Sequence, residues 1–85
     1  SRIPEEEIVP RGREIYERDV RPRLGPEHEG KFLVIDVESG DYEISDDDGE
    51  AFARAEDRHP EAVFFVLRVG PGGVSRPAYR IGAGL

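Results

Sequence analysis

Cysteine is absent from this sequence of 85 residues, so a disulfide framework and a thiolate metal site are both excluded. Long apolar runs are missing too, and nothing approaches the roughly 20 residues that a membrane-spanning helix requires. No signal-peptide pattern is visible, although the sequence does not begin with methionine. We therefore expect one small domain in the reducing cytoplasm, with no membrane partner.

Acidic residues are missing from residues 62–85, which contain three arginines. Residues 1–31 are nearly balanced, with seven basic and eight acidic side chains, whereas residues 32–61 contain eleven acidic and two basic ones. The net charge of −7 therefore originates in the middle of the chain. This charge repels phosphate backbones and argues against a nucleic-acid partner. It suits a basic protein surface, although a solvated acidic face is the simpler interpretation.

The middle of the chain begins with a predicted β-hairpin. The run FLVIDV, which starts at Phe32, is rich in branched and aromatic residues and favours a strand. A two-residue turn at Ser39-Gly40 would place Asp36 opposite Glu43. One face of the hairpin is then apolar and the other is mixed. The apolar face comprises Leu33, Ile35, Val37, Tyr42 and Ile44, and the mixed face comprises Phe32, Val34, Asp36, Glu43 and Ser45.

An acidic cap predicts the start of the main helix. Asp47 and Glu50 have the spacing of a capping box, and carboxylates in a first turn oppose the helix dipole. Pro60 ends the segment. We therefore expect this helix from Asp48 to His59, with Phe52 on its inward face.

Proline residues delimit a first helix. We expect it from Pro10 to Arg21, because Pro22 cannot continue it, and we expect the nine residues before it to be loosely ordered. Ile15, Tyr16 and Val20 form a narrow apolar stripe along this helix. The helix either packs across the sheet or projects as an arm that forms a dimer.

Two further strands are expected after the main helix. Residues 62–69 form the most apolar run and predict an interior strand, residues 70–77 predict a flexible loop, and residues 78–81 predict a short fourth strand. The fold class is then α+β, with an N-terminal helix followed by a ββαββ unit and a four-stranded antiparallel sheet in the order 2-1-3-4. The expected divisions are residues 1–30 for the helical arm and connector, 31–82 for the ββαββ domain and 83–85 for the tail.

The main helix is expected to cover the apolar face of the hairpin. The opposite face carries Phe32 and Val34 and is too apolar to remain in water. Either the N-terminal helix or another chain should cover it.

No combination of residues predicts catalysis. Facing carboxylates at Asp36 and Glu43 could hold a cation or act as an acid–base pair, together with Arg68 and Arg80. No histidine or glycine-rich loop converges on them, however. The acidic run 46–48 fails the spacing of a calcium loop, and the two histidines lack a third ligand for zinc. We therefore expect no catalytic, cofactor-binding or metal-binding residues.

Four segments between residues 10 and 82 carry a resemblance, and they read RGREIYERDVRP, GKFLVIDVESGDYEI, RHPEAVFFVLRVG and AYRIG. They resemble a group of small bacterial proteins. Genes of that group often neighbour those of small retropepsin-like aspartic proteases or toxin–antitoxin-like pairs, so the resemblance implies a protein partner encoded nearby. It implies no catalytic residue. Gly49 and the segment PGGVSRP depart from the pattern, in which a larger apolar residue and a shorter turn are expected.

These observations lead to three hypotheses. The first is a small acidic protein–protein interaction or regulatory module, antitoxin-like and without catalytic activity, that binds through the second sheet face, an edge strand or the N-terminal helix. The second is a small ligand- or metal-binding domain, or a minor enzyme, that uses the four charged residues named above. The third is a structural homodimer through Phe32 and Val34. The residues expected to contact a partner are Ile15, Tyr16, Phe32, Val34, Asp36, Glu43, Tyr79 and Arg80.

Overall fold

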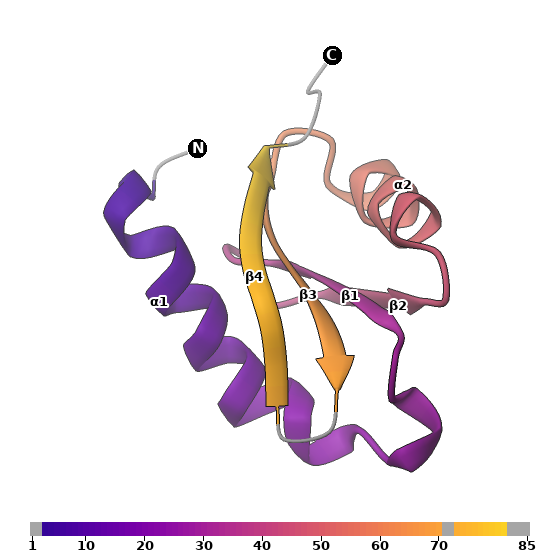
Figure 1. The fold of residues 1–85 in the computed structure, drawn as a ribbon. Helices are drawn as coiled ribbons and strands as arrows, with labels where there is room; N and C mark the ends of the chain where they lie inside the picture. Colours follow the sequence, from indigo (N-terminus) through magenta and orange to yellow (C-terminus); the bar gives the residue numbers. More distant parts are fainter. Residues whose placement is uncertain (1–2, 71–72, 82–85) are drawn as a thin grey trace.

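A computed structural model describes residues 3–70 and 73–81, the latter range by its backbone alone. Each of the two α-helices precedes a pair of strands along the chain, and short π-helical and 3₁₀ segments link the first helix to the first strand (Figure 1). The elements are α1 (Glu5–Ile15), the π-helical segment η1 (Tyr16–Val20), the 3₁₀ segments η2 (Arg21–Arg23) and η3 (Pro26–His28), β1 (Phe32–Asp36), β2 (Tyr42–Ser45), α2 (Asp48–Arg58), β3 (Val63–Gly70) and β4 (Gly73–Ile81).

The strands form one antiparallel sheet in the order β2-β1-β3-β4. All of β1 is buried except the half-exposed Phe32, as expected for a strand with neighbours on both sides. Its register with β3 pairs Ile35 with Phe65 and Asp36 with Phe64. The predicted α+β class, with an N-terminal helix, an antiparallel sheet and a second helix, is confirmed.

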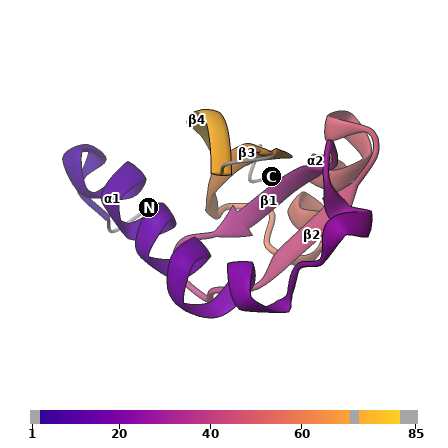
Figure 2. The ribbon, with the colours of Figure 1, turned by 60° about the horizontal axis from the view of Figure 1, so that its bottom comes forward.

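The two helices lie on opposite sides of the sheet (Figures 1 and 2). Helix α1 approaches the sheet closely at Gly12, where an added Cβ would overlap the ring of Phe65. The N-terminal helix therefore packs on its own sheet, and the alternative of a projecting arm is not observed. The cluster on this side includes Ile8, Ile15, Tyr16, Val20, Leu33, Ile35, Val37, Phe65, Leu67 and Val69.

The predicted assignment of the helices to the two faces is wrong. Helix α2 packs over Val34 and Phe64, on the face that was expected to need another cover, and the N-terminal helix covers the face of Leu33, Ile35 and Val37. Side-chain volume explains why the two helices cover the opposite faces from those predicted. Helix α2 contributes only small alanines to the buried part of its cluster. The larger N-terminal side chains require the broader apolar face.

Helix α1 begins at Glu5, five residues before the predicted start, and Pro10 lies inside it. Glu5, Glu6 and Glu7 occupy its first turn, where negative charge opposes the helix dipole. Ile8 is 3 % exposed, so the extra turn buries an apolar side chain. This burial offsets the backbone hydrogen bond that proline cannot make.

The predicted hairpin register is wrong by two residues. Ile35 pairs with Tyr42 and Val34 with Glu43, so the loop is longer than the expected two-residue turn. Gly40 has a φ of 84° in this loop, a conformation that favours glycine. A shift by two residues leaves each strand side chain on its predicted face, because the alternation along a strand has a period of two.

Helix α2 begins as predicted and ends one residue before His59, which caps it. The Asp47 carboxylate accepts hydrogen bonds from the backbone N–H groups of Gly49 and Glu50, which confirms the predicted N-cap. The reciprocal half of the capping box is absent from this part of the structure, because the Asp47 N–H donates to Ser45 Oγ instead.

Strand β4 is longer than the predicted strand at residues 78–81. It starts at Gly73, so most of the segment 70–77 that was expected to be a flexible loop is extended. An irregularity in the β3–β4 register lies between Val66 and Arg68, opposite the part of β4 that contains Pro77. Proline tolerates such an irregular edge position because it has no N–H to donate to a regular ladder.

Both α-helices span 11 residues. Over residues 3–70 and 73–81, no helix combines the length and the apolar character that crossing a bilayer would require.

Candidate functional site

The loop between β1 and β2 is organised by the buried carboxylate of Asp36. This residue is 3 % exposed. Its Oδ1 accepts hydrogen bonds from the backbone N–H groups of Glu38, at 2.8 Å, and Ser39, at 3.4 Å, while its Oδ2 accepts one from Ser39 Oγ at 2.8 Å. The backbone N–H of Gly40 donates to the Asp36 carbonyl at 2.8 Å. One aspartate thus supports the loop through several bonds, and this explains why the loop is longer than a two-residue turn.

His59 joins this loop to the end of α2. Its Nε2 lies 2.9 Å from Asp41 Oδ2, and its Nδ1 lies 3.5 Å from Asp36 Oδ2. Each ring nitrogen therefore faces a carboxylate. An imidazole protonated on both nitrogens can donate to both acids, and such a charge is also favourable near the C-terminus of a helix.

Arg58 extends the same cluster towards β2. Its guanidinium lies 3.1 Å from Asp41 Oδ2 and 2.7 Å from Glu43 Oε2. The hydrogen bond from His59, together with the positive charges of Arg58 and His59, holds the pKa of Asp41 below its ordinary value. Ion pairs of Arg58 and His59 with Asp41 and Glu43 therefore hold the C-terminal end of α2 against the hairpin.

The loop is also bonded to α1 on its other side. Arg11 Nε donates to the Val37 carbonyl at 3.0 Å. Val37 is fully buried although it lies in the loop, and its N–H donates to the Val63 carbonyl at 3.2 Å. The loop thus contacts the helix on each face of the sheet and the start of β3.

A hollow of about 530 Å³ lies between the loop and the end of α2. Asp36, Arg58 and His59 line it together with two exposed carboxylates, Glu38 and Glu61. Within the described residues, neither Glu38 nor Glu61 forms an ion pair, whereas Arg58 and His59 are both engaged by acids. The hollow therefore has uncompensated negative charge at its rim.

The cluster does not have the geometry of a Ser–His–Asp relay. Ser39 Oγ donates to Asp36, and its oxygen accepts from the Asp41 N–H at 3.1 Å, so the hydroxyl is engaged away from His59. In the part of the chain that the structure describes, no group of three histidine and carboxylate side chains is placed to hold a metal ion. What the arrangement provides is a fixed loop and an array of surface carboxylates.

Of the four charged residues expected to form a ligand site, Asp36 and Glu43 line one small pocket together with Arg58 and His59, whereas Arg68 lies elsewhere. Asp36 lies beside Asp41 and His59, while Glu43 pairs with Arg58 opposite Val34 in the sheet. Arg68 lies opposite Phe32, near the far end of β1, with its guanidinium 5.4 Å from the centre of that ring. It also donates to the Gly30 carbonyl. The side chain of the fourth residue, Arg80, lies outside the described part.

Four of the residues expected to contact a partner are buried in the chain itself, although one of them, Asp36, also lines the hollow. They are Ile15, Tyr16, Val34 and Asp36. Burial of Val34 also removes half of the predicted homodimer contact. Phe32 and Glu43 are half-exposed, and the side chains of Tyr79 and Arg80 lie outside the described part.

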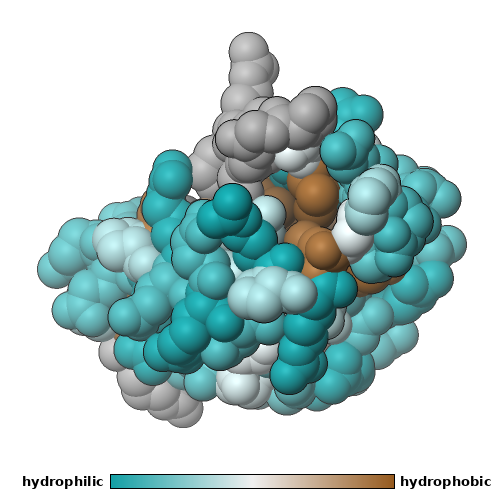
Figure 3. Space-filling model, turned by 90° about the horizontal axis from the view of Figure 1, so that it is seen from below, coloured by the Kyte–Doolittle hydropathy of each residue, from teal (hydrophilic) through white to brown (hydrophobic). Residues whose placement is uncertain are grey.

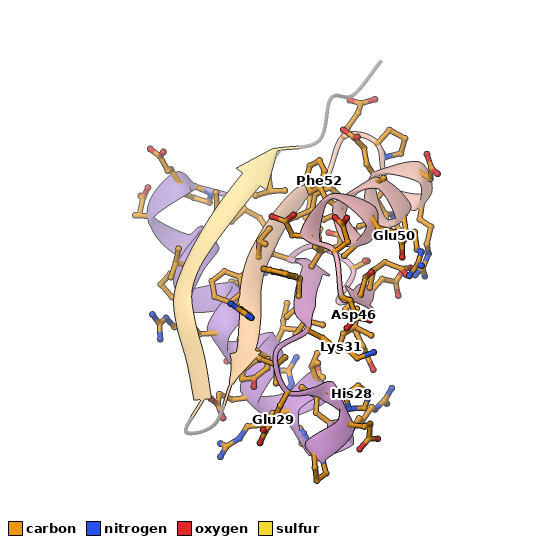
Figure 4. All side chains as sticks on the ribbon, turned by 45° about the vertical axis from the view of Figure 1, so that its right-hand side comes forward. His28, Glu29, Lys31, Asp46, Glu50 and Phe52 are labelled. Carbon is orange, nitrogen blue, oxygen red and sulfur yellow. The ribbon has the colours of Figure 1, made fainter. Side chains whose placement is uncertain are left out.

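Further acidic and aromatic side chains surround the start of α2. Phe52 and Glu50 extend from α2, Asp46 precedes it, and Lys31 lies next to Asp46 at the entry to β1 (Figure 4). Lys31 Nζ is 3.7 Å from Asp46 Oδ1, and Arg54 pairs with Glu50. Seen from below, the molecule is mostly hydrophilic, with a small hydrophobic area on this view (Figure 3). The charges of Asp46 and Glu50 near the start of α2 are therefore neutralised by ion pairs, unlike those of the carboxylates at the rim of the hollow.

Sequence reasoning missed the contacts of His59 and Arg58 with the hairpin. His59 and Asp41 are 18 residues apart, and nothing local marks them as neighbours. The only available signal was the Asp–x–x–Ser spacing of Asp36 and Ser39, which is compatible with a side-chain-supported turn.

Comparison of the chain with protein-family models, with curated proteins and with solved structures found no match. The resemblance to the group of small bacterial proteins therefore stays a prediction.

Proposed function

We propose that this protein is a small acidic interaction module that binds a basic partner protein and regulates it, as an antitoxin does, without catalysing a reaction itself. The observation that carries the proposal is the pair of exposed carboxylates, Glu38 and Glu61, at the rim of one hollow. Neither forms an ion pair within the described residues, because the nearby Arg58 and His59 pair with other acids, so a cation from another molecule would complete their charge.

The distribution of charge supports a basic partner. Arg54 and Arg58 are the only arginines or lysines between residues 32 and 61, and each already pairs with an acidic side chain. The remaining acidic surplus creates a negative potential that would attract a basic protein and increase its rate of association. This effect is screened by salt, because the Debye length is only about 8 Å at physiological ionic strength.

The character of the hollow favours an arginine or lysine side chain over an apolar small molecule. Its volume lies in the range of ordinary ligand sites, roughly 300–1,000 Å³. Such sites usually have mainly apolar walls, however, whereas Asp36, Glu38, Glu61, Arg58 and His59 make this one strongly polar. A guanidinium that reached Glu38 or Glu61 would form charge-assisted hydrogen bonds with the carboxylate.

Neutralising the two rim carboxylates tests the proposal. The double variant Glu38→Gln/Glu61→Gln should bind the product of a neighbouring gene about fivefold more weakly in calorimetry at low salt, since two exposed ion pairs of about 0.5 kcal/mol each contribute about 1 kcal/mol in total. The wild-type interaction should also weaken as salt is raised.

The matched control is Glu7→Gln/Glu29→Gln, which removes the same charge from two exposed positions outside the hollow. Its affinity should remain within about twofold of wild type. Equal weakening by both double variants would remove the hollow from the proposal. Absence of any basic partner, in co-purification with neighbouring gene products and at low salt, would reject the proposed function.

A further inference from the structure

The outer edge of β2 has a defined pattern of unpaired backbone groups. On one side of β1, the Asp36 N–H donates to the Asp41 carbonyl at 2.8 Å, and on the other side the Val37 N–H donates to the Val63 carbonyl. Bonds alternate between the two sides along a strand. Residues 41, 43 and 45 of the hairpin therefore bond to β1, while Tyr42 and Ile44 direct their N–H and C=O groups away from the sheet.

No other secondary-structure element in the described chain pairs with this edge. β2 is the terminal strand of the sheet, and it contacts β1 and α2. Among residues 3–70 and 73–81, no loop or helix backbone donates to or accepts from the backbone of Tyr42 or Ile44. Both side chains are half-buried, so a fifth strand would gain backbone bonds and some apolar contact.

The charges along β2 identify the kind of strand that fits. Glu43 is in the middle, Asp41 precedes the strand, and the acidic run 46–48 follows it. Arg58 pairs with both Asp41 and Glu43, and Lys31 pairs with Asp46, but these five acids still outnumber the two cations. If two copies paired antiparallel about Glu43, that carboxylate would face its own copy, and facing like charges destabilise a sheet. A basic strand would instead meet the surplus of negative charge that remains along this edge.

We propose that β2 is a docking edge at which an extended, lysine- or arginine-rich segment of a partner protein adds as a fifth strand. This inference rests on the proposed function and specifies its mode of binding: the backbone groups of Tyr42 and Ile44 bond to the segment, and the flanking acids select its charge. β4 at the opposite edge belongs to residues 62–85, which contain three arginines and no acid, so it does not suit a basic strand.

Amide hydrogen exchange measured by NMR tests this pairing directly. The probe is a capped eight-residue peptide of alternating lysine and threonine, and the control peptide alternates glutamate and threonine. At a peptide concentration ten times the Kd, the Tyr42 and Ile44 amides should exchange about tenfold more slowly than in the free protein. The Glu43 amide should be protected with or without peptide, because it already bonds to β1.

The variant Ile44→Pro removes the outward N–H and leaves the ladder to β1 intact, since proline is tolerated on the solvent side of an edge strand. It should abolish binding of the lysine peptide, whereas Ile44→Val should preserve it. If the proline variant does not fold, the exchange measurement on the wild-type protein still decides the question.

Three results would overturn the docking edge. They are failure of the lysine peptide to bind, binding that leaves the Tyr42 and Ile44 amides unchanged, and a concentration-dependent dimer in light scattering that protects the same amides without peptide. None of them affects the test on Glu38 and Glu61, so the interaction module can survive the loss of this binding mode.

Discussion

Asp36 combines deep burial with several hydrogen bonds to one loop, so its replacement should be costly. Removing its carboxylate in Asp36→Ala leaves the N–H groups of Glu38 and Ser39 without their acceptor and deprives His59 of one acid. We expect a loss of about 2–4 kcal/mol in the free energy of unfolding, measured by urea denaturation.

The control for this substitution is Ser39→Ala, which removes one hydroxyl from the same network and should cost about 1 kcal/mol. A cost below about 0.5 kcal/mol for Asp36→Ala would mean that the loop is held by its backbone and not by this side chain.

The lowered pKa of Asp41 predicts that the free energy of unfolding depends on pH in the acidic range. Its pKa is lower in the folded protein than its ordinary value, because His59 donates to it and Arg58 lies nearby. Its ionised form therefore stabilises the fold above the pKa of the unfolded state, and that contribution is lost as the pH falls through the lower folded pKa. Between pH 7 and pH 3, wild type should lose more stability than Asp41→Asn, as measured by urea denaturation at each pH. Parallel profiles for the two proteins would show that Asp41 does not contribute.

At the scale of elements, the contact between α1 and β3 depends on a missing side chain. Gly12 lies against the ring of Phe65, and an added methyl group would overlap it. Gly12→Ala should destabilise the protein by about 1–3 kcal/mol, despite the higher helix propensity of alanine. Thermal unfolding followed by circular dichroism provides the measurement. Arg13→Ala, at the exposed neighbouring position, should change the stability by less than about 0.5 kcal/mol. An unchanged or raised melting temperature for Gly12→Ala would mean that α1 does not pack at this position.

Elements whose signals are local were predictable, and those that depend on distant partners were not. The Asp47 cap lies within three residues of the N–H groups that it binds. Pro60 directly follows the C-cap of α2, so the end of this helix is also marked locally. The start of α1 depends instead on burial of Ile8 beneath the sheet, and the extent of β4 depends on its pairing with β3. Sequence patterns do not contain those contacts.

At the scale of the whole molecule, the sequence predicted which side chains share a face but not which helix covers each face. The period of two along Leu33, Ile35 and Val37 survives a register error, so the two faces were correctly separated. To predict which helix covers which face would have required a comparison of side-chain volumes in α1, the sheet and α2. The candidate site could not be predicted from the sequence for a related reason. His59 contacts Asp36 and Asp41 only because α2 packs over the sheet.

The β1–β2 loop has a consequence for how the molecule comes apart. Arg11 from one layer and His59 from the other both bond to it, and its Val37 is sealed beneath them. Neither helix can separate from the sheet without disturbing the loop to which the other helix is bonded. Heat or denaturant should therefore melt both layers in a single cooperative transition, leaving no stable fragment that consists of the sheet and one helix.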